Sequence, residues 1–543
     1  MKQQKKFFTL LCSITLLTTV PAYADMSPEE DAEEYFFIEA GLPDISGELI
    51  KESCTDLTPF QVVTFLTNPG DAILIQNFLQ LQLYKSTAPV VVRSLQDNPN
   101  LRSRRIDECD GHNQLSMKLF FMQMRKAFLT PCSPFIESYL AINDPEVTGE
   151  IDRLSQALEE AGDLPQAIDI PTILPLFSKI KLEERRIGGM FAYQRRDDWF
   201  EWRLQVPLYY FEHNFFLTKQ EQAAIADAPL FKDISANQDS SCSGNTVQDF
   251  LTEHVVNDFF GIGDLRAQFL ADVITTDCFI FSLGAELDLP TTITLARGII
   301  GRNFSECPEQ PPFDYFKLMC LAQTNPTAAQ NLGMQFGIGA LDRLTQIAGL
   351  AHLGSQHAGI GLLAEFDYSF DETLRWDNKF RLFYSCPANE KRFFRTIKNP
   401  VDFERDYEDL ALGEANNLFL SEQTVLFLYP PVVIARTIPG VITQYTTSFF
   451  WNRDCFKAEL GYDLWYQGPE QLRIVDYLGA PRNLDVCKGI KAAAIQHKIF
   501  ANIAVDRNDG CYDWRFMFFG DVTFANRGIG KDWTVGVDLR TLF

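Results

Sequence analysis

Residues 199–211, WFEWRLQVPLYYF, alternate between large apolar and other side chains. Apolar groups stand at every second position, and Glu201, Arg203 and Gln205 stand between them. Because the side chains of a β-strand point alternately to its two faces, this segment is predicted to be a strand with one apolar and one polar face. The fold depends on whether the apolar face meets a protein core or a lipid bilayer.

The same alternation allows twelve segments to be drawn as strands. They are 115–126, 185–194, 199–211, 262–272, 278–290, 356–370, 373–386, 440–451, 454–466, 490–505, 511–524 and 532–543. Most exceed the usual strand length of about 5–6 residues and are long enough to cross a bilayer when tilted. Aromatic residues near the ends of the apolar faces, such as Trp202 and Tyr210, would form girdles at the membrane surfaces. A soluble β-sandwich, whose strands also alternate, is the alternative.

The connections between these segments are alternately short and mostly long. The short ones fall at 195–198, 273–277, 371–372, 452–453 and 506–510. Bacterial barrels have short periplasmic turns, longer outer loops and an even number of strands. When connections are counted back from a periplasmic C-terminus, every short one falls on the periplasmic side. We therefore predict an all-β fold, a closed antiparallel transmembrane β-barrel of about 12 strands (range about 10–14) with long, partly helical outer loops.

The chain opens with a segment typical of export. A basic start and an apolar stretch precede the small residues Ala22 and Ala24. Residues 1–24 are therefore predicted to be a secretory signal peptide. Residues 25–110 would then form either a periplasmic segment or a plug in the lumen, and residues 111–543 the transmembrane barrel.

Charge and cysteine content narrow the function further. The formal net charge of −24 is spread along the chain and argues against a nucleic-acid partner.

Eleven of the twelve cysteines follow the signal peptide, and an odd number in an exported protein suggests disulfides plus one unpaired thiol. Cys307 and Cys320 share one predicted outer loop, and we expect them to pair, with a gain of roughly 3 kcal/mol in the chain-entropy model. Neither a Cys-x-x-Cys pair nor a zincin histidine spacing is present, so no metal or cofactor is expected.

The polar strand faces carry charges of both signs and would line the lumen. The predicted pore-lining residues are Glu201, Arg203, Asp264, Arg266, Glu286, Asp288, Glu365, Asp367, Arg375, Asp377, Lys379, Arg381, Lys457, Glu459, Asp463, Asp513, Arg515, Asp538 and Arg540. Rings of charge would bias the passage of ions or solutes. The alternative is a set of ion pairs that fills a narrow barrel. Acidic and basic members nearly balance, so no ion preference is predicted.

Two stretches resemble known proteins. The segment from Trp533 to Phe543 resembles the closing strand of bacterial outer-membrane β-barrels. That resemblance implies an outer-membrane location and recognition of Phe543 by the barrel-assembly machinery. Residues 260–270 and 283–291 resemble a hairpin of porin-like transporters for aromatic hydrocarbons and long-chain fatty acids. This second resemblance implies passage of hydrophobic compounds, often past an N-terminal hatch.

Together these features predict an outer-membrane channel or transporter for passive passage of small solutes, hydrophobic ones among them. Its expected partners are outer-membrane lipid, the barrel-assembly machinery and the solutes. A barrel whose long outer loops serve adhesion or surface structure is the alternative. An outer-membrane hydrolase is a third possibility, but the sequence contains no Gly-x-Ser-x-Gly motif, and no catalytic residue is predicted.

Overall fold

The computed structural model describes a set of segments that together contain most of the predicted strands. They are residues 84–103, 113–127, 133, 135–140, 145, 180–216, 223, 254–301, 321, 325–349, 352–395, 429–453, 455–475, 484–508 and 513–543. All of them fall within the unit Thr58–Phe543. The predicted signal peptide lies outside them, as do Cys307 and Cys320. No helix in the described segments is both long enough and apolar enough to cross a membrane.

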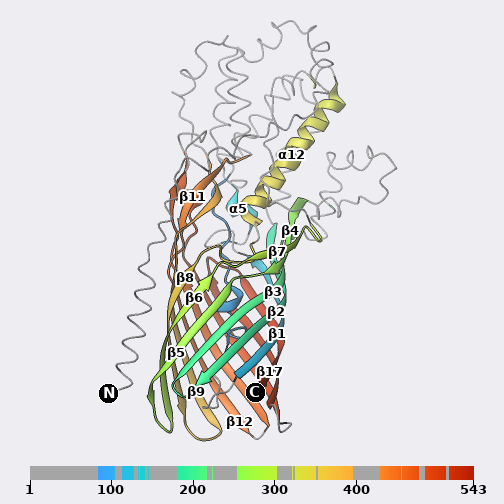
Figure 1. Ribbon diagram of the computed structural model, residues 1–543. Helices are drawn as coiled ribbons and strands as arrows, with labels where there is room; N and C mark the ends of the chain where they lie inside the picture. Colours follow the sequence, from blue (N-terminus) through green and yellow to red (C-terminus); the bar gives the residue numbers. More distant parts are fainter. Residues whose placement is uncertain are drawn as a thin grey trace. The chain divides into compact units, whose positions relative to one another are not determined.

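Twelve antiparallel strands form one closed ring (Figure 1). They are β1 (Asn113–Ala127), β2 (Lys181–Asp197), β3 (Phe200–Phe216), β5 (Leu265–Thr275), β6 (Phe279–Leu289), β8 (Gly359–Ser369), β9 (Leu374–Ser385), β12 (Ile442–Arg453), β13 (Phe456–Gln467), β15 (Ala494–Asn508), β16 (Asp513–Arg527) and β17 (Lys531–Leu542). Each pairs with the next in this order, and β17 pairs with β1. The predicted all-β closed barrel is confirmed, and each of the twelve predicted segments overlaps one ring strand.

The ring closes between its first and last strands. Gln114 stands opposite Leu542 in the register of β1 and β17. At the end of this pairing the Asn113 N–H donates to the Phe543 carbonyl at 2.9 Å, and the Phe543 N–H donates to the Asn113 carbonyl at 3.0 Å. Phe543 therefore holds one end of the seam.

The short connections lie together at one end of the ring, which we call the turn end (Figure 1). The C-terminus lies at this end as well. The long connections leave from the opposite end, the loop end, and two of them contain helices in their described parts. These are α5 (Ile136–Tyr139) and α12 (Pro326–Gly349). The predicted alternation of short turns and long, partly helical loops is thus present.

Five short strands extend the ring toward the loop end, and the sequence analysis did not predict them as separate strands. They are β4 (Val256–Ile262), β7 (Ile293–Arg297), β10 (Ala388–Phe393), β11 (Val432–Ile438) and β14 (Gln471–Ile474). Each is separated from a ring strand by a break that contains Gly263, Pro290, Pro387, Gly440 or Gly468. Proline donates no backbone hydrogen bond, and a Cβ on Gly440 would lie 2.0 Å from the Gly468 carbonyl oxygen. These residues therefore interrupt the ladder at the level where the extension begins.

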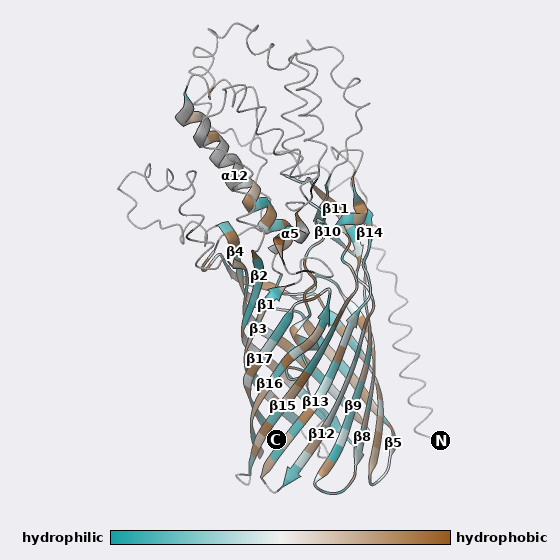
Figure 2. Cartoon of the chain, turned by 180° about the vertical axis from the view of Figure 1, so that it is seen from behind, coloured by the Kyte–Doolittle hydropathy of each residue, from teal (hydrophilic) through white to brown (hydrophobic). Residues whose placement is uncertain are grey.

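The two faces of the ring differ in chemistry. Outward side chains are apolar and accessible, for example Leu362, Leu460 and Phe518, which are 64%, 61% and 58% exposed. Alternate positions, such as Glu459 and Asp463, are buried inside. Figure 2 shows apolar and polar positions following one another along the same strands. An apolar exterior around a polar interior is the reverse of a water-soluble barrel and is typical of one that faces lipid.

Candidate functional site

Residues 84–103, here called the inner segment, run through the interior of the ring and include the short 3-10 helix η1 (Leu95–Asp97) (Figure 1). Its side chains are almost inaccessible: Arg93, Asp97 and Asn100 are at most 2% exposed. Buried polar groups of this kind are stable only when they have hydrogen-bond or charge partners. The partners come from strands all around the ring.

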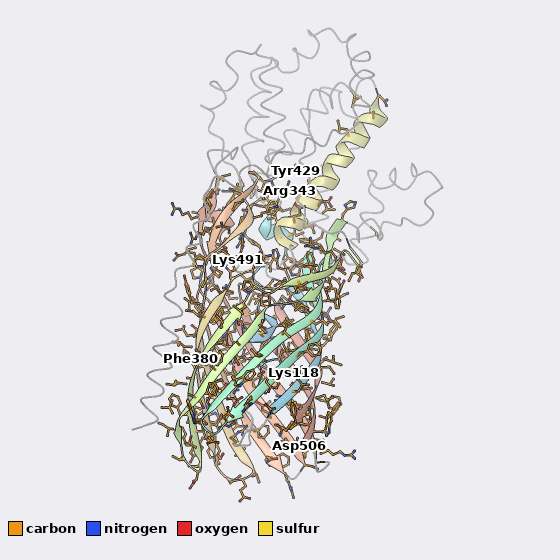
Figure 3. The ribbon with its side chains drawn as sticks, viewed as in Figure 1. Lys118, Arg343, Phe380, Tyr429, Lys491 and Asp506 are labelled. Carbon is orange, nitrogen blue, oxygen red and sulfur yellow. The ribbon has the colours of Figure 1, made fainter. Side chains whose placement is uncertain are left out.

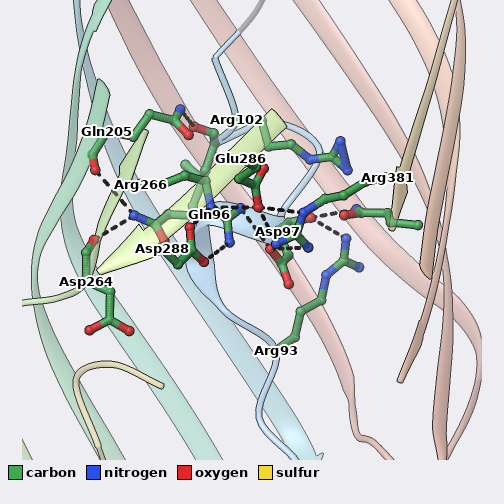
Figure 4. Close-up of polar contacts among 12 residues, drawn as sticks. Arg93, Gln96, Asp97, Arg102, Gln205, Asp264, Arg266, Glu286, Asp288 and Arg381 are labelled. Carbon is green, nitrogen blue, oxygen red and sulfur yellow. Dashed lines mark hydrogen bonds and ion pairs between the residues drawn. The ribbon is translucent and has the colours of Figure 1, made fainter. Parts of the chain in front are cut away.

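Asp97 is the centre of a group of ion pairs that joins the inner segment to the wall (Figure 4). Its Oδ1 lies 2.9 Å from Arg266 Nη1 and 3.0 Å from Arg381 Nη1, and Trp465 Nε1 donates to its Oδ2 at 3.2 Å. Both arginines also contact Glu286, at 3.4 Å from Arg266 and 2.5 Å from Arg381. Asp97 therefore joins β5, β9 and β13 through one carboxylate.

A second set of contacts binds the inner segment to β13 and the neighbouring β15. Arg93 Nη2 lies 2.6 Å from an Asp463 carboxylate oxygen, and Arg93 Nη1 donates to Gln496 at 2.9 Å. Arg102 lies 3.6 Å from the other Asp463 oxygen. Asp463 thus balances two arginines that stand on either side of η1.

A third set lies across the lumen on β1, β16 and β17. Lys118 Nζ donates to the Asn100 carbonyl at 2.7 Å, and Asn100 Nδ2 donates to Asp521 at 2.9 Å. Asn98 Nδ2 donates to the Thr534 hydroxyl at 3.0 Å. Since β9, which Asp97 contacts through Arg381, stands opposite β1 in the order of the ring, the inner segment bridges the lumen from wall to wall.

Apolar side chains complete this contact. Leu95 and Leu101 of the inner segment are 3% and 0% exposed. They belong to one cluster with inward-facing residues of the wall, among them Phe120, Met122, Met190, Met517 and Phe519. Full burial of one leucine side chain is worth about 1.5–3 kcal/mol, so these contacts add substantially to the ion pairs.

A cavity of about 190 Å³ lies against the inner segment toward the loop end, and we call it the mouth cavity. Val90 and Leu95 of the inner segment, Ile347 of α12 and residues 352–357 contribute to its lining. Lys491, labelled in Figure 3, lines it from the wall. Charged side chains such as Arg93, Glu390 and Arg392 also line it, so apolar and charged groups share its walls.

A smaller cavity of about 50 Å³ lies toward the turn end. Arg102 of the inner segment lines it together with Arg375, Asp377 and Lys457 from the wall. Figure 3 marks this end of the barrel by Asp506. The inner segment therefore stands between two cavities, and charged side chains contribute to the lining of both.

The structure places the described members of the predicted pore-lining set on the inside, buried or half-buried. Most are joined in ion pairs. Arg203 lies 2.7 Å from both Glu201 and Glu365, and Arg266 lies 2.7 Å from Asp288. The pairs Arg375–Asp377, Lys379–Glu365, Arg540–Asp538, Lys457–Asp506 and Arg515–Asp506 are also present. Asp367 lines the turn-end cavity, and Asn502 donates to Glu459 at 2.8 Å.

Four members of the set, Asp264, Arg266, Arg381 and Asp463, contact the inner segment itself. Asp264 lies in the break between β4 and β5, and its carboxylate accepts hydrogen bonds from Ser355 and Thr292. The Asp513 side chain lies outside the description, as does the predicted Cys307–Cys320 pair. Within the described segments, no group of three or more His, Cys, Asp or Glu side chains is arranged to hold a metal ion.

No family model and no curated protein matches the sequence. Among solved structures, the chain is similar to an outer-membrane channel of Pseudomonas putida F1, with 10% identity over 81% of this chain and 100% of that chain and a TM-score of 0.38. It is also similar to the toluene transporter TodX of Pseudomonas putida, with 8% identity over 85% of this chain and 95% of that chain and a TM-score of 0.28. A FadL homologue of Pseudomonas aeruginosa shows 7% identity over 85% and 98% of the two chains, with a TM-score of 0.30. The function proposed below is argued from this chain's own residues.

Proposed function

We propose that this chain is an outer-membrane channel or transporter for the passive passage of small solutes. The observation that carries the proposal is a closed ring with an apolar exterior whose lumen holds a segment between two cavities. Only helices and closed barrels can span a bilayer, because every backbone polar group there must be paired internally. A solute would enter the mouth cavity first, and the apolar part of its lining favours hydrophobic solutes.

Passage would be controlled by the inner segment. Its contacts reach opposite walls of the lumen through Asp97, Arg93 and Asn100. A solute larger than water would therefore require the inner segment to shift, which costs the ion pairs around Asp97. The inner segment acts in this proposal as a plug, and no catalytic role is proposed for any residue.

The proposal also names the partners that the chain would meet during export, assembly and residence in the membrane. Outer-membrane lipid would contact the exposed apolar belt, which includes Leu460 and Phe518. Phe543 would be read by the barrel-assembly machinery before it takes its place at the seam beside Asn113. Residues 1–24 would direct export through the secretory pathway.

Planar-bilayer recordings and liposome swelling with refolded full-length protein test this function. We expect discrete conductance steps in a minority of channels, because the inner segment blocks most of them, and uptake of small solutes into vesicles. Silence of both the wild-type protein and a variant with a weakened inner segment would contradict the proposal. Surface binding that depends on the long loops would, in that event, favour the adhesion alternative.

Native cysteines provide a test of sidedness. Cys278 and Cys455 are exposed in turns at the turn end, and Cys487 is exposed at the loop end within η2 (Val486–Gly489). A membrane-impermeant maleimide should modify Cys487 in intact cells, and Cys278 and Cys455 only after the outer membrane is opened. Peptide mass spectrometry assigns each modification. Equal labelling of Cys278 and Cys487 in intact cells would mean that the ring does not span the membrane.

A further inference from the structure

Two buried histidines at the loop end have unusual hydrogen-bond partners. His213, on β3, is 1% exposed. Its Nε2 lies 3.0 Å from a Glu184 carboxylate oxygen, and its Nδ1 lies 3.0 Å from the Gly349 carbonyl oxygen. Gly349 is the last residue of α12, so this carbonyl belongs to the negative end of the helix dipole.

His357 repeats this arrangement elsewhere in the mouth. It is 5% exposed. Its Nε2 lies 2.5 Å from a Glu390 carboxylate oxygen, and its Nδ1 lies 2.8 Å from the Cys386 carbonyl oxygen. Each histidine is therefore held between one carboxylate and one backbone carbonyl.

These contacts determine the protonation of both rings. A carbonyl oxygen can only accept a hydrogen bond, and so can an ionised carboxylate. Glu184 is ionised because Arg186 lies 2.6 Å from its other oxygen, and Glu390 because Arg392 lies 2.8 Å from its other oxygen. Burial opposes ionisation of Glu390, but the hydrogen bond from His357 and the charge of Arg392 outweigh it and hold its pKa below the ordinary value.

Both ring nitrogens of each histidine must therefore donate, which only the imidazolium form can do. A neutral ring would turn a lone pair toward an oxygen on one side and lose that hydrogen bond. The arrangement is complete only when His213 and His357 carry a proton on each nitrogen.

The two histidines fix the two parts of the roof of the mouth cavity, which we define as the end of α12 (residues 346–349) and residues 352–357. His213 holds the first part through the Gly349 carbonyl. His357 belongs to the second part and ties it to β10. Between them, Tyr209 donates to the Leu353 carbonyl and Ser355 donates to Asp264. The roof is thus anchored at each part by a charge-assisted hydrogen bond.

We propose that His213 and His357 form a proton-dependent clasp that holds the roof of the mouth cavity closed when both are imidazolium ions and loosens it as the pH rises. The sign follows from the geometry. The protonated rings satisfy every acceptor, so the clasp is complete when both rings are protonated and is weakened when either ring loses a proton. The proposal concerns access to the mouth cavity and holds whichever solute enters.

The arginines and carboxylates around the two rings keep their charge as the pH rises. His213 faces Glu184 and Arg186 of β2, with Asp532 of β17 near the same carboxylate and the uncharged Asn257 of β4 on the Gly349 carbonyl. Arginines stay charged, and the carboxylates are paired. The two histidines therefore carry the pH response.

His357 faces Glu390 and Arg392 of β10, with Lys491 near the same carboxylate. One further histidine, His352, lies near these groups and near His213. Desolvation within the mouth, with the nearby charge of Lys491, lowers the pKa of His352 to about 4. His352 is therefore neutral at about pH 5 and above.

Hydrogen exchange measured by mass spectrometry tests the clasp on the full-length protein in lipid nanodiscs. Protection factors, corrected for intrinsic exchange, are compared at about pH 5 and about pH 8 for peptides covering the roof. Loss of one charge-assisted hydrogen bond predicts protection about tenfold lower at the higher pH. Peptides from the ring strands near the turn end should not change.

Variants separate the two halves of the clasp. His213→Gln should remove the pH dependence in peptides ending α12, and His357→Gln should remove it in peptides covering 352–357, since glutamine cannot donate from both sides. Glu390→Gln should match His357→Gln without removing the ring. The matched control is His497→Gln, because His497 lies outside on β15, where its Nδ1 is 2.7 Å from the Tyr462 hydroxyl.

Three outcomes would overturn the clasp: a roof whose protection is independent of pH in the wild-type protein, a pH dependence that persists in both histidine variants, or a loss of pH dependence in His497→Gln. Since the readout is local exchange, conductance plays no part in it. Failure of the clasp is therefore distinguishable from failure of the channel proposal.

Discussion

Asp97→Asn is expected to convert an infrequently conducting barrel into one that conducts most of the time. The substitution removes the carboxylate that Arg266 and Arg381 share from the inner segment. Breaking a buried ion pair by removing one partner costs about 3–5 kcal/mol. If about 3 kcal/mol of this comes from the free energy that holds the inner segment in place, the fraction of molecules with a displaced inner segment rises on the order of 100-fold. Single-channel recordings would measure the open fraction.

Asp506→Asn is the matched control for this experiment. Asp506 lies at the turn end, where it pairs with Lys457 at 2.8 Å and Arg515 at 2.7 Å. The same change of charge and shape there leaves the contacts of the inner segment in place, so the open fraction should stay near that of the wild type. An unchanged open fraction in Asp97→Asn, in protein that folds normally, would remove the inner segment from the control of passage.

Leu460→Arg should destabilise the barrel by about 2–4 kcal/mol if the midpoint of β13 lies at the bilayer midplane. Leu460 is 61% exposed on the outward face, opposite Phe449 and Ala501 of the neighbouring strands. A guanidinium there must sit in hydrocarbon or draw water into it. Equilibrium folding into phospholipid vesicles, followed by denaturant titration, gives the free energy of unfolding.

Ile434→Arg is the comparison for the lipid-facing position. Ile434 is also apolar, outward and 39% exposed, but it lies on β11 in the loop-end extension opposite the exposed Lys391. The cost there should be about 0–1 kcal/mol, as near an interface. Equal costs at Leu460 and Ile434 would place both residues in the same solvent and contradict a membrane belt limited to the ring.

The ring strands could be predicted because the outward and inward positions of each strand have different surroundings and alternate along the sequence. An outward position such as Leu460 is apolar and its inward neighbour Glu459 is charged, so every second residue carries the preference. Turns such as Ser369 to Leu374 are equally local. The number and order of the ring strands therefore followed from patterns within about fifteen residues of sequence.

The inner segment has no such local signal. Its contacts join residues far apart in the chain, as Arg93 and Asp463 do across 370 positions. No periodicity marks a segment whose every side chain meets a different strand. One indirect signal was available: β1 and β16 are apolar on both faces at Phe120 and Phe519, where a wet lumen would require polar residues. Such a strand indicates that something apolar covers its inner face.

The breaks in the wall coincide with the limits of the predicted strands. Pro290 and Pro387 stand at the ends of two predicted strands, and Gly440 and Gly468 lie at or near the limits of two others. The short strands beyond the breaks fall almost wholly in segments predicted as loops, because each is too short to cross a bilayer. Charge alternation likewise identified Arg203 and Glu365 as inward residues, but their distance of 2.7 Å depends on which strands become neighbours.

The position of the seam sets the order in which this molecule can assemble. The inner segment precedes β1 in the sequence, and the ring closes only when β17 pairs with β1, more than four hundred residues later. If the inner segment entered a ring that was already closed, the guanidinium groups of Arg93 and Arg102 and the carboxylate of Asp97 would lose their water before they reached a partner. We therefore expect closure as the final step, with the inner segment already in contact with Lys118 of β1. The segment that obstructs the finished barrel would then be enclosed while the barrel forms.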